Sequence, residues 1–180
     1  MLDYIKIIEK FYTRNSELYN LLIAHSKQVA DFAMNIIKHN PDSGIDKDFV
    51  YEAAMLHDIG IFKTHAPSIH CTGNMPYICH GYLGREILEI EGLPKHALVC
   101  EHHTGSGLTA EEIAARNLPL PHRDMLPLSI EEKLVCYADK FFSKSHIRPA
   151  KPIENVREEL ARFGASSLAR FDAMHALFSF

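Results

Sequence analysis

Two aspartates stand in segments that have the pattern of buried helices, and this limits how the chain can fold. Asp58 follows an Ala-Ala-Met-Leu run, and Asp139 lies within the largely apolar stretch 134–142. Burying a carboxylate costs several kcal/mol unless it is paired, hydrogen-bonded or bound to a metal. Each aspartate taken alone is compatible with a structural ion pair, such as Asp139 with Lys140 or Lys133. The fold must therefore bring a partner to each carboxylate.

Histidine is unusually frequent, with 12 among 180 residues, and neutral imidazole is the commonest metal ligand in proteins. Four histidines are placed on, or at the end of, an apolar helical face: His25, His57, His80 and His103. One such residue alone would more often be a hydrogen-bonded core histidine than a ligand. Here, however, four histidines and two aspartates on five predicted helices all stand at positions that should be apolar. One explanation covers all six, which is that they converge on metal.

The ligand types narrow the choice of metal. Imidazole and carboxylate without thiolate suit iron, manganese, cobalt, nickel or zinc, and we favour iron or manganese. Six ligands exceed those of a tetrahedral structural zinc site, so we expect two divalent transition metals. Ions in such sites lie about 3.5–4 Å apart, within reach of one bridging carboxylate, for which Asp58 is the candidate. The cysteines form no CxxC motif and are expected to be reduced: Cys71, Cys79, Cys100 and Cys136.

Apolar residues recur at spacings of three and four, and no stretch shows the period of two of a half-buried strand. The fold class is therefore all-α, with about seven to nine helices. Ser/Thr-x-x-Glu capping boxes mark two helix starts, at Thr109 and Ser129. Loops are predicted at 63–75 and at the proline-rich segment 118–127. The other helices are expected at about 3–12, 16–39, 46–60, 76–92, 94–103, 153–163 and 167–178.

The length suits one domain over residues 1–180, with a ligand-bearing core at 16–145 and C-terminal helices at 152–179 packing on it. The N-terminus lacks a basic region followed by a long apolar core. Apolar runs also stay short of the ~18 residues that span a membrane. We therefore expect a soluble, cytoplasmic protein without a membrane segment. The net charge of −4 argues against broad nucleic-acid binding, and a homodimer is left open.

These residues carry a resemblance to a known family. His25, the segment Leu56-His57-Asp58-Ile59-Gly60 and Asp139 resemble the ligand set of the HD superfamily of metal-dependent phosphohydrolases. His80-Gly81 and His102-His103 resemble the additional ligands of its dinuclear branches. The HDIG-type chain is similar to HD-GYP cyclic di-GMP phosphodiesterases and to diadenosine tetraphosphate hydrolases. It departs from the HD-GYP pattern at 104–107, which argues against cyclic di-GMP as substrate.

The resemblance implies a fold and a ligand set. It implies a single HD-domain helical bundle in which His25, His57, Asp58 and Asp139 hold one metal. Asp58, together with His80 and His103, would hold the second. The neighbouring His102 is either a further ligand or a contact to a ligand or to the substrate.

The implied function is metal-assisted hydrolysis of a phosphate ester or anhydride, with a nucleotide as the expected small phosphorylated substrate. Asp58, Lys63 and His102 are the candidate catalytic residues. The candidate substrate-binding residues are Lys63, His65, Arg85, Lys140 and Lys144. For these cationic residues, a solvated surface charge is the alternative.

Two other functions fit the same ligand pattern. Some HD proteins with these six ligands are mixed-valent diiron oxygenases that act on a small polyol or phosphonate. A non-catalytic, nucleotide-binding regulatory module is the second alternative. The predicted loops at 63–75 and 118–127 would shape the pocket, and neither carries a motif that names the substrate.

Overall fold

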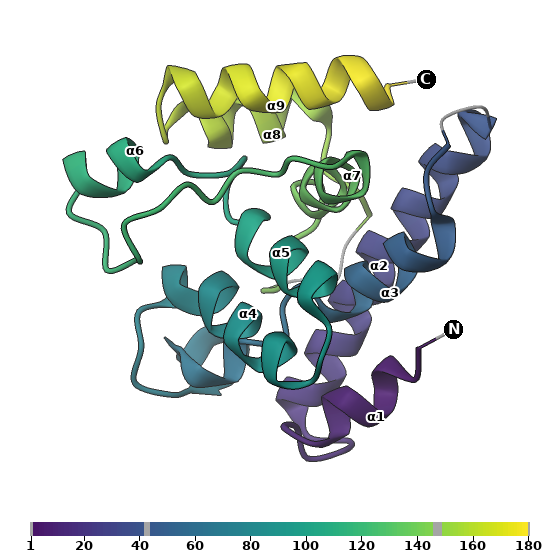
Figure 1. The fold of residues 1–180 in the computed structure, drawn as a ribbon, viewed down its shortest axis with the longest axis vertical. Helices are drawn as coiled ribbons and strands as arrows, with labels where there is room; N and C mark the ends of the chain where they lie inside the picture. Colours follow the sequence, from purple (N-terminus) through teal and green to yellow (C-terminus); the bar gives the residue numbers. More distant parts are fainter. Residues whose placement is uncertain (1, 42–43, 146–148, 180) are drawn as a thin grey trace.

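The computed structural model describes residues 2–41, 44–145 and 149–179, and this part of the chain contains nine α-helices (Figure 1). The predicted all-α class is confirmed. The sheet present is a small antiparallel pair, β1 (His65–Ala66) with β2 (Cys71–Thr72), within the predicted loop 63–75. The helices are α1 (Tyr4–Glu9), α2 (Glu17–His39), α3 (Lys47–Leu56), α4 (His80–Ile90), α5 (Pro94–His102), α6 (Ala110–Ala115), α7 (Ile130–Asp139), α8 (Ile153–Ala161) and α9 (Ala165–Phe178).

Side-chain caps fix several of these helix starts where the sequence places them. Ser16 accepts a hydrogen bond from the Tyr19 amide and begins α2. Both predicted capping boxes are present, at Thr109 before α6 and at Ser129 before α7. Some boundaries differ from the prediction. Helices α1 and α3 end earlier than expected, at Glu9 and Leu56. The residues after Pro76 form the short 3-10 helix η4 (Tyr77–Cys79), and α4 begins only at His80.

The helices pack in an order that brings four helix ends together. In Figure 1, α2 and α3 lie side by side, and α4 packs on α5. Helix α7 contacts α2, α3, α5 and α9, while α8 pairs with α9 above it. The Tyr137 ring of α7 stacks on Phe171 of α9 with 5.4 Å between ring centroids. The division of residues 1–180 into a ligand-bearing core at 16–145 and C-terminal helices at 152–179 that pack on it stays a prediction.

Two glycines let α4 and α5 approach closely. A Cβ atom at Gly81 would lie 2.8 Å from the Cys100 carbonyl oxygen, and one at Gly84 would lie 2.4 Å from Cys100 Sγ. Side chains would not fit there without a shift of the neighbouring helix. This close contact holds the start of α4, with His80, beside the end of α5, with His103.

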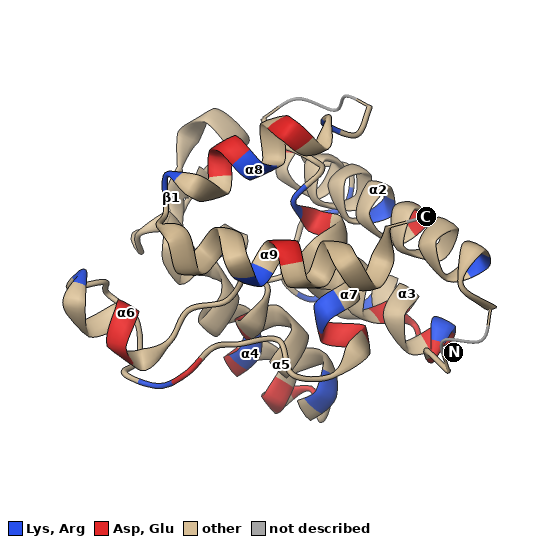
Figure 2. Cartoon of the chain, turned by 90° about the horizontal axis from the view of Figure 1, so that it is seen from above, with Lys and Arg blue, Asp and Glu red and all other residues tan. Residues whose placement is uncertain are grey.

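Charged residues of both signs are mixed along the helices, and α8 and α9 each carry acidic and basic positions (Figure 2). None of the described helices combines the length and the apolar character that crossing a membrane requires.

Replacing Gly84 by Ala tests the close packing of α4 on α5. We expect Gly84→Ala to lower the free energy of unfolding by about 1–3 kcal/mol through overpacking against Cys100 Sγ. Helix propensity alone predicts the opposite sign, a gain of about 1 kcal/mol. Urea unfolding measures the difference.

The matched control uses Cys100→Ala, which removes the sulfur that the new methyl group meets. In that background Gly84→Ala should be neutral or stabilising. An equal loss of stability in both backgrounds would contradict the packing explanation.

Candidate metal centre

Four buried side chains converge beside the middle of α2. His25 comes from α2, His57 and Asp58 follow α3 directly, and Asp139 ends α7. His25 Nε2 lies 3.0 Å from Asp139 Oδ1 and 3.3 Å from Asp58 Oδ2. His57 Nε2 lies 3.2 Å from Asp58 Oδ2 and 3.4 Å from Asp139 Oδ1. One donor atom from each residue falls within 4.8 Å of all the others, close enough to hold one metal ion.

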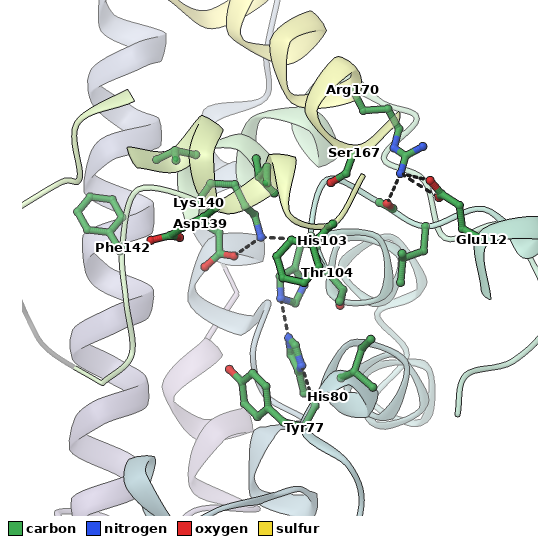
Figure 3. A pocket seen from close by; sticks show the side chains of 18 of the residues that line it. Tyr77, His80, His103, Thr104, Glu112, Asp139, Lys140, Phe142, Ser167 and Arg170 are labelled. Carbon is green, nitrogen blue, oxygen red and sulfur yellow. Dashed lines mark hydrogen bonds and ion pairs between the residues drawn. The ribbon is translucent and has the colours of Figure 1, made fainter. Parts of the chain in front are cut away.

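A second group shares Asp58 with the first. His80 Nε2 and His103 Nε2 lie 3.5 and 3.4 Å from Asp58 Oδ1, and 3.1 Å from each other (Figure 3). The two carboxylate oxygens of Asp58 therefore face different groups, Oδ2 toward the first and Oδ1 toward the second. This is the arrangement that a bridging carboxylate requires.

Three of the histidines are oriented by the same backbone contact. In each, Nδ1 donates to the carbonyl oxygen three residues earlier, at 2.7 Å. Because a carbonyl only accepts, Nδ1 carries a proton in each of the three, and Nε2 is the ring nitrogen that faces the centre. The pairs are His57 with Ala54, His80 with Tyr77, and His103 with Cys100.

The unsatisfied atoms of the centre fit a cation. His57 Nε2 and Asp58 Oδ1 are fully buried and make no hydrogen bond, which is costly for polar atoms. Two imidazole lone pairs also face each other across the 3.1 Å between His80 and His103. Burial lowers the pKa of His80 to about 3 and also lowers the pKa of His103. Both imidazoles are therefore neutral, as metal binding requires.

The other charges of the centre are strongly coupled. Burial opposes protonation of His57, but Asp58 and Asp139 outweigh it and raise its pKa to about 9, so His57 must lose its Nε2 proton when a cation binds there. Burial also opposes ionisation of both aspartates, yet nearby cations hold their pKa values well below the usual range. Lys144 Nζ lies 2.7 Å from Asp58 Oδ2, and Lys140 Nζ lies 2.7 Å from Asp139 Oδ2. The predicted ion pair of Asp139 with Lys140 is thus present and uses Asp139 Oδ2. The other oxygen of this carboxylate, Oδ1, still faces His25 and His57.

A cavity of about 380 Å³ opens from this centre. His80, His103 and Asp139 line one end, together with Lys140 (Figure 3). Lys144, a second predicted substrate-binding residue, also lines the cavity, with its Nζ beside Asp58. Lys140 Nζ also donates to the His103 carbonyl oxygen at 3.0 Å. Two ammonium groups therefore border the buried carboxylates.

Three other predicted substrate-binding residues are not among those that line this cavity. Lys63 lies in the short 3-10 helix η2 (Ile61–Lys63), and His65 is exposed on β1. Arg85 forms ion pairs with Glu89 and Glu101. The substrate-binding roles of Lys63, His65 and Arg85 stay predictions. Of the five residues predicted to bind substrate, the structure brings Lys140 and Lys144 to the centre.

His102 is directed away from both ligand groups. Its Nδ1 lies 2.6 Å from Glu132 Oε2, and its Nε2 lies 3.5 Å from Glu101 Oε2. Burial opposes its protonation, but these two carboxylates raise the pKa of His102. The geometry favours a contact that supports the end of α5 over ligation.

Sequence reasoning missed Glu101, which is 1% exposed. It pairs with His102 and with two arginines, Arg85 and Arg123. Burial opposes its ionisation, but His102 and the arginines lower its pKa to about 2. The available signal was a carboxylate set directly after the apolar positions of a helix, the same anomaly that marks Asp58.

The adjacent histidines give a sharp test of the second ligand group. We expect His103→Ala to lower the metal content by about one ion per chain, because His103 Nε2 faces Asp58 Oδ1. His102→Ala, the matched control, should leave the metal content unchanged, since His102 contacts Glu132 and Glu101. Elemental analysis after loading with Mn²⁺ measures both. The reverse pattern would show that the ligand of this turn is misassigned.

Comparison with known proteins finds one relative of similar length and two that are much longer. The uncharacterized protein MJ0778 of Methanocaldococcus jannaschii is 36% identical over 121 residues, which cover 66% of this chain and 64% of its own. The tRNA (cytidine(56)-2'-O)-methyltransferase of Picrophilus torridus is 36% identical over 140 residues, 77% of this chain and 36% of the enzyme. The enzyme of that name from Thermoplasma volcanium is 30% identical over 151 residues, which cover 83% of this chain and 40% of the enzyme. The chain thus spans less than two thirds of each relative.

No solved structure matches the chain. The HD domain family, in contrast, matches residues 22–143, well over half of the 180 residues. That segment contains all six side chains of the two groups, from His25 to Asp139. The protein therefore belongs to the HD domain family, whose members form a superfamily of metal-dependent hydrolases.

Proposed function

We propose that this protein is a metal-dependent phosphohydrolase that acts on an ester or anhydride of a small phosphorylated compound, with nucleotides as the favoured class. The observation that carries the proposal is Asp58. Its two buried oxygens face two histidine groups, and Lys140 and Lys144 stand at the edge of the same cavity. A centre for cations thus adjoins a place for an anionic substrate.

The arrangement of the donor atoms supports two divalent transition metals as cofactors, with iron or manganese favoured. His25, His57, Asp58 and Asp139 would hold one ion, and Asp58 with His80 and His103 the other. When bound, such ions activate water for attack and neutralise charge on the phosphoryl group.

Lys144 has two roles in this proposal. In the structure its Nζ lies 2.7 Å from Asp58 Oδ2 and lends positive charge to the centre. With the carboxylate neutralised by ions, the same ammonium group is available to pair with a phosphoryl oxygen. Lys140 is held by Asp139 and the His103 carbonyl, so it contributes charge from a fixed position. Lys63 and His102 remain untested as catalytic residues.

The relatives widen the set of substrates to be tested. Two of them are named tRNA (cytidine(56)-2'-O)-methyltransferases, and the chain covers 36% and 40% of their lengths. We therefore include phosphorylated tRNA fragments beside nucleotides, cyclic nucleotides and dinucleoside polyphosphates. Phosphate release is measured with Mn²⁺, Fe²⁺ or Co²⁺, with and without oxygen. Oxygen consumption without phosphate release would instead favour the diiron oxygenase.

Lys144→Met tests phosphate binding at this centre. We expect kcat/KM for the best substrate to fall about 10–100-fold, the loss typical of a hydrogen bond to a charged group. Lys38→Met, at the exposed end of α2, is the control and should keep full activity. Unchanged kcat/KM in Lys144→Met would refute its role in phosphate binding.

A further inference from the structure

The C-terminal helices line the end of the cavity that lies away from the metal centre. Val156 and Leu160 of α8, Phe163 of the following turn, and Ser167 and Arg170 of α9 all line it. Ser167 and Arg170 are labelled at this end in Figure 3. All five residues follow position 143, where the match to the HD domain family ends. This far wall is therefore a feature of this chain beyond the family segment.

The far wall is mainly apolar. Two carboxylates that line it are already paired: Glu112 with Arg170 at 2.9 Å, and Glu159 with Lys151 at 2.7 Å. Their charges are thus largely compensated within the protein. The apolar side chains of the far wall are Val156, Leu160 and Phe163. Ile78, Leu108 and Phe142 are further apolar residues that line the cavity, and Phe142 lies beside Asp139 and Lys140 (Figure 3).

Hydrogen bonds fix the far wall relative to the ligands. Arg170 donates to the carbonyl oxygens of Ser106 and Gly107 at 3.2 and 2.9 Å. Ser106 Oγ in turn donates to the Ser167 carbonyl oxygen at 2.7 Å. These bonds join α9 to the turn that directly follows His103. The spacing between the metal centre and the far wall is therefore set by the fold.

The cavity thus has two chemically different ends. The ammonium groups of Lys140 and Lys144 suit a phosphoryl group at one end, and the apolar wall suits a body with little charge at the other. A small polyol would leave that wall in contact with water, which is unfavourable. The volume of about 380 Å³ is near the lower end of small-molecule sites, about 300–1,000 Å³. One ring system fits such a space better than two nucleosides.

We infer that α8 and α9 form a leaving-group subsite, which accepts one flat, largely uncharged ring carried by the group that is esterified to the phosphoryl group, such as the base of a single nucleotide. The inference rests on the proposed hydrolase function, because it names the substrate class of the same centre. It predicts that affinity depends on the ring even when the phosphoryl group is unchanged.

Phe163 is the residue of choice for a test. It is 56% exposed, so its truncation should not disturb the core. The guanidinium carbon of Arg116 lies 6.0 Å from its ring centroid, which keeps the ring at the cavity edge. Leu177 is the matched control, since it is 52% exposed on α9 and is not among the cavity-lining residues.

The experiment compares phenylphosphonate with methylphosphonate, which share the anionic group and are not hydrolysed. Calorimetry on the Mn²⁺-loaded protein should show phenylphosphonate binding about tenfold or more tightly. Phe163→Ala should reduce this preference about three- to tenfold and leave methylphosphonate affinity unchanged. Leu177→Ala should keep the full preference.

Equal affinities for the two phosphonates, no binding of either, or an unchanged preference in Phe163→Ala would overturn the subsite. The hydrolase proposal fails in a different way. If the protein prefers phenylphosphonate but releases no phosphate from phenyl phosphate or from the substrate panel, the subsite stands and the hydrolase proposal is wrong.

Discussion

The buried carboxylate of Asp58 is the constraint on which the site depends. It is 0% exposed, and each of its oxygens faces a different pair of histidines. An unpaired charge at such a position would cost several kcal/mol. The fold meets this requirement by bringing the ends of α3, α4, α5 and α7 to the middle of α2. The close approach at Gly81 and Gly84 and the i−3 carbonyl bonds of the histidines serve the same convergence.

The sequence predicted local features well because each has a local physical cause. Caps at Ser16, Thr109 and Ser129 satisfy helix amides within three residues, and both capping boxes are present. Side-chain partners were harder to predict, because they depend on distant segments. Arg85, predicted to bind substrate, instead pairs with Glu101 of the next helix. Lys144 lines the cavity and Lys63 does not, because their positions depend on where loops lie after folding.

The centre and the far wall of its cavity lie on different parts of the chain. The family segment 22–143 holds all six ligands, while α8 and α9 supply the apolar end of the cavity. Family membership therefore bears on the chemistry of the centre, whereas part of the cavity proposed to bind the substrate lies outside the matched segment. Relatives of greater length share only part of their sequence with this chain, so their names guide substrate tests without defining the substrate.

Anomalous X-ray scattering from crystals loaded with Mn²⁺ tests the central claim most directly, because it locates the ions without relying on activity. The account predicts two peaks per chain with Asp58 between them. One should lie beside His25, His57 and Asp139, and the other beside His80 and His103. A single peak, or peaks that do not contact Asp58, would contradict the assignment of this carboxylate as the bridge between two metals.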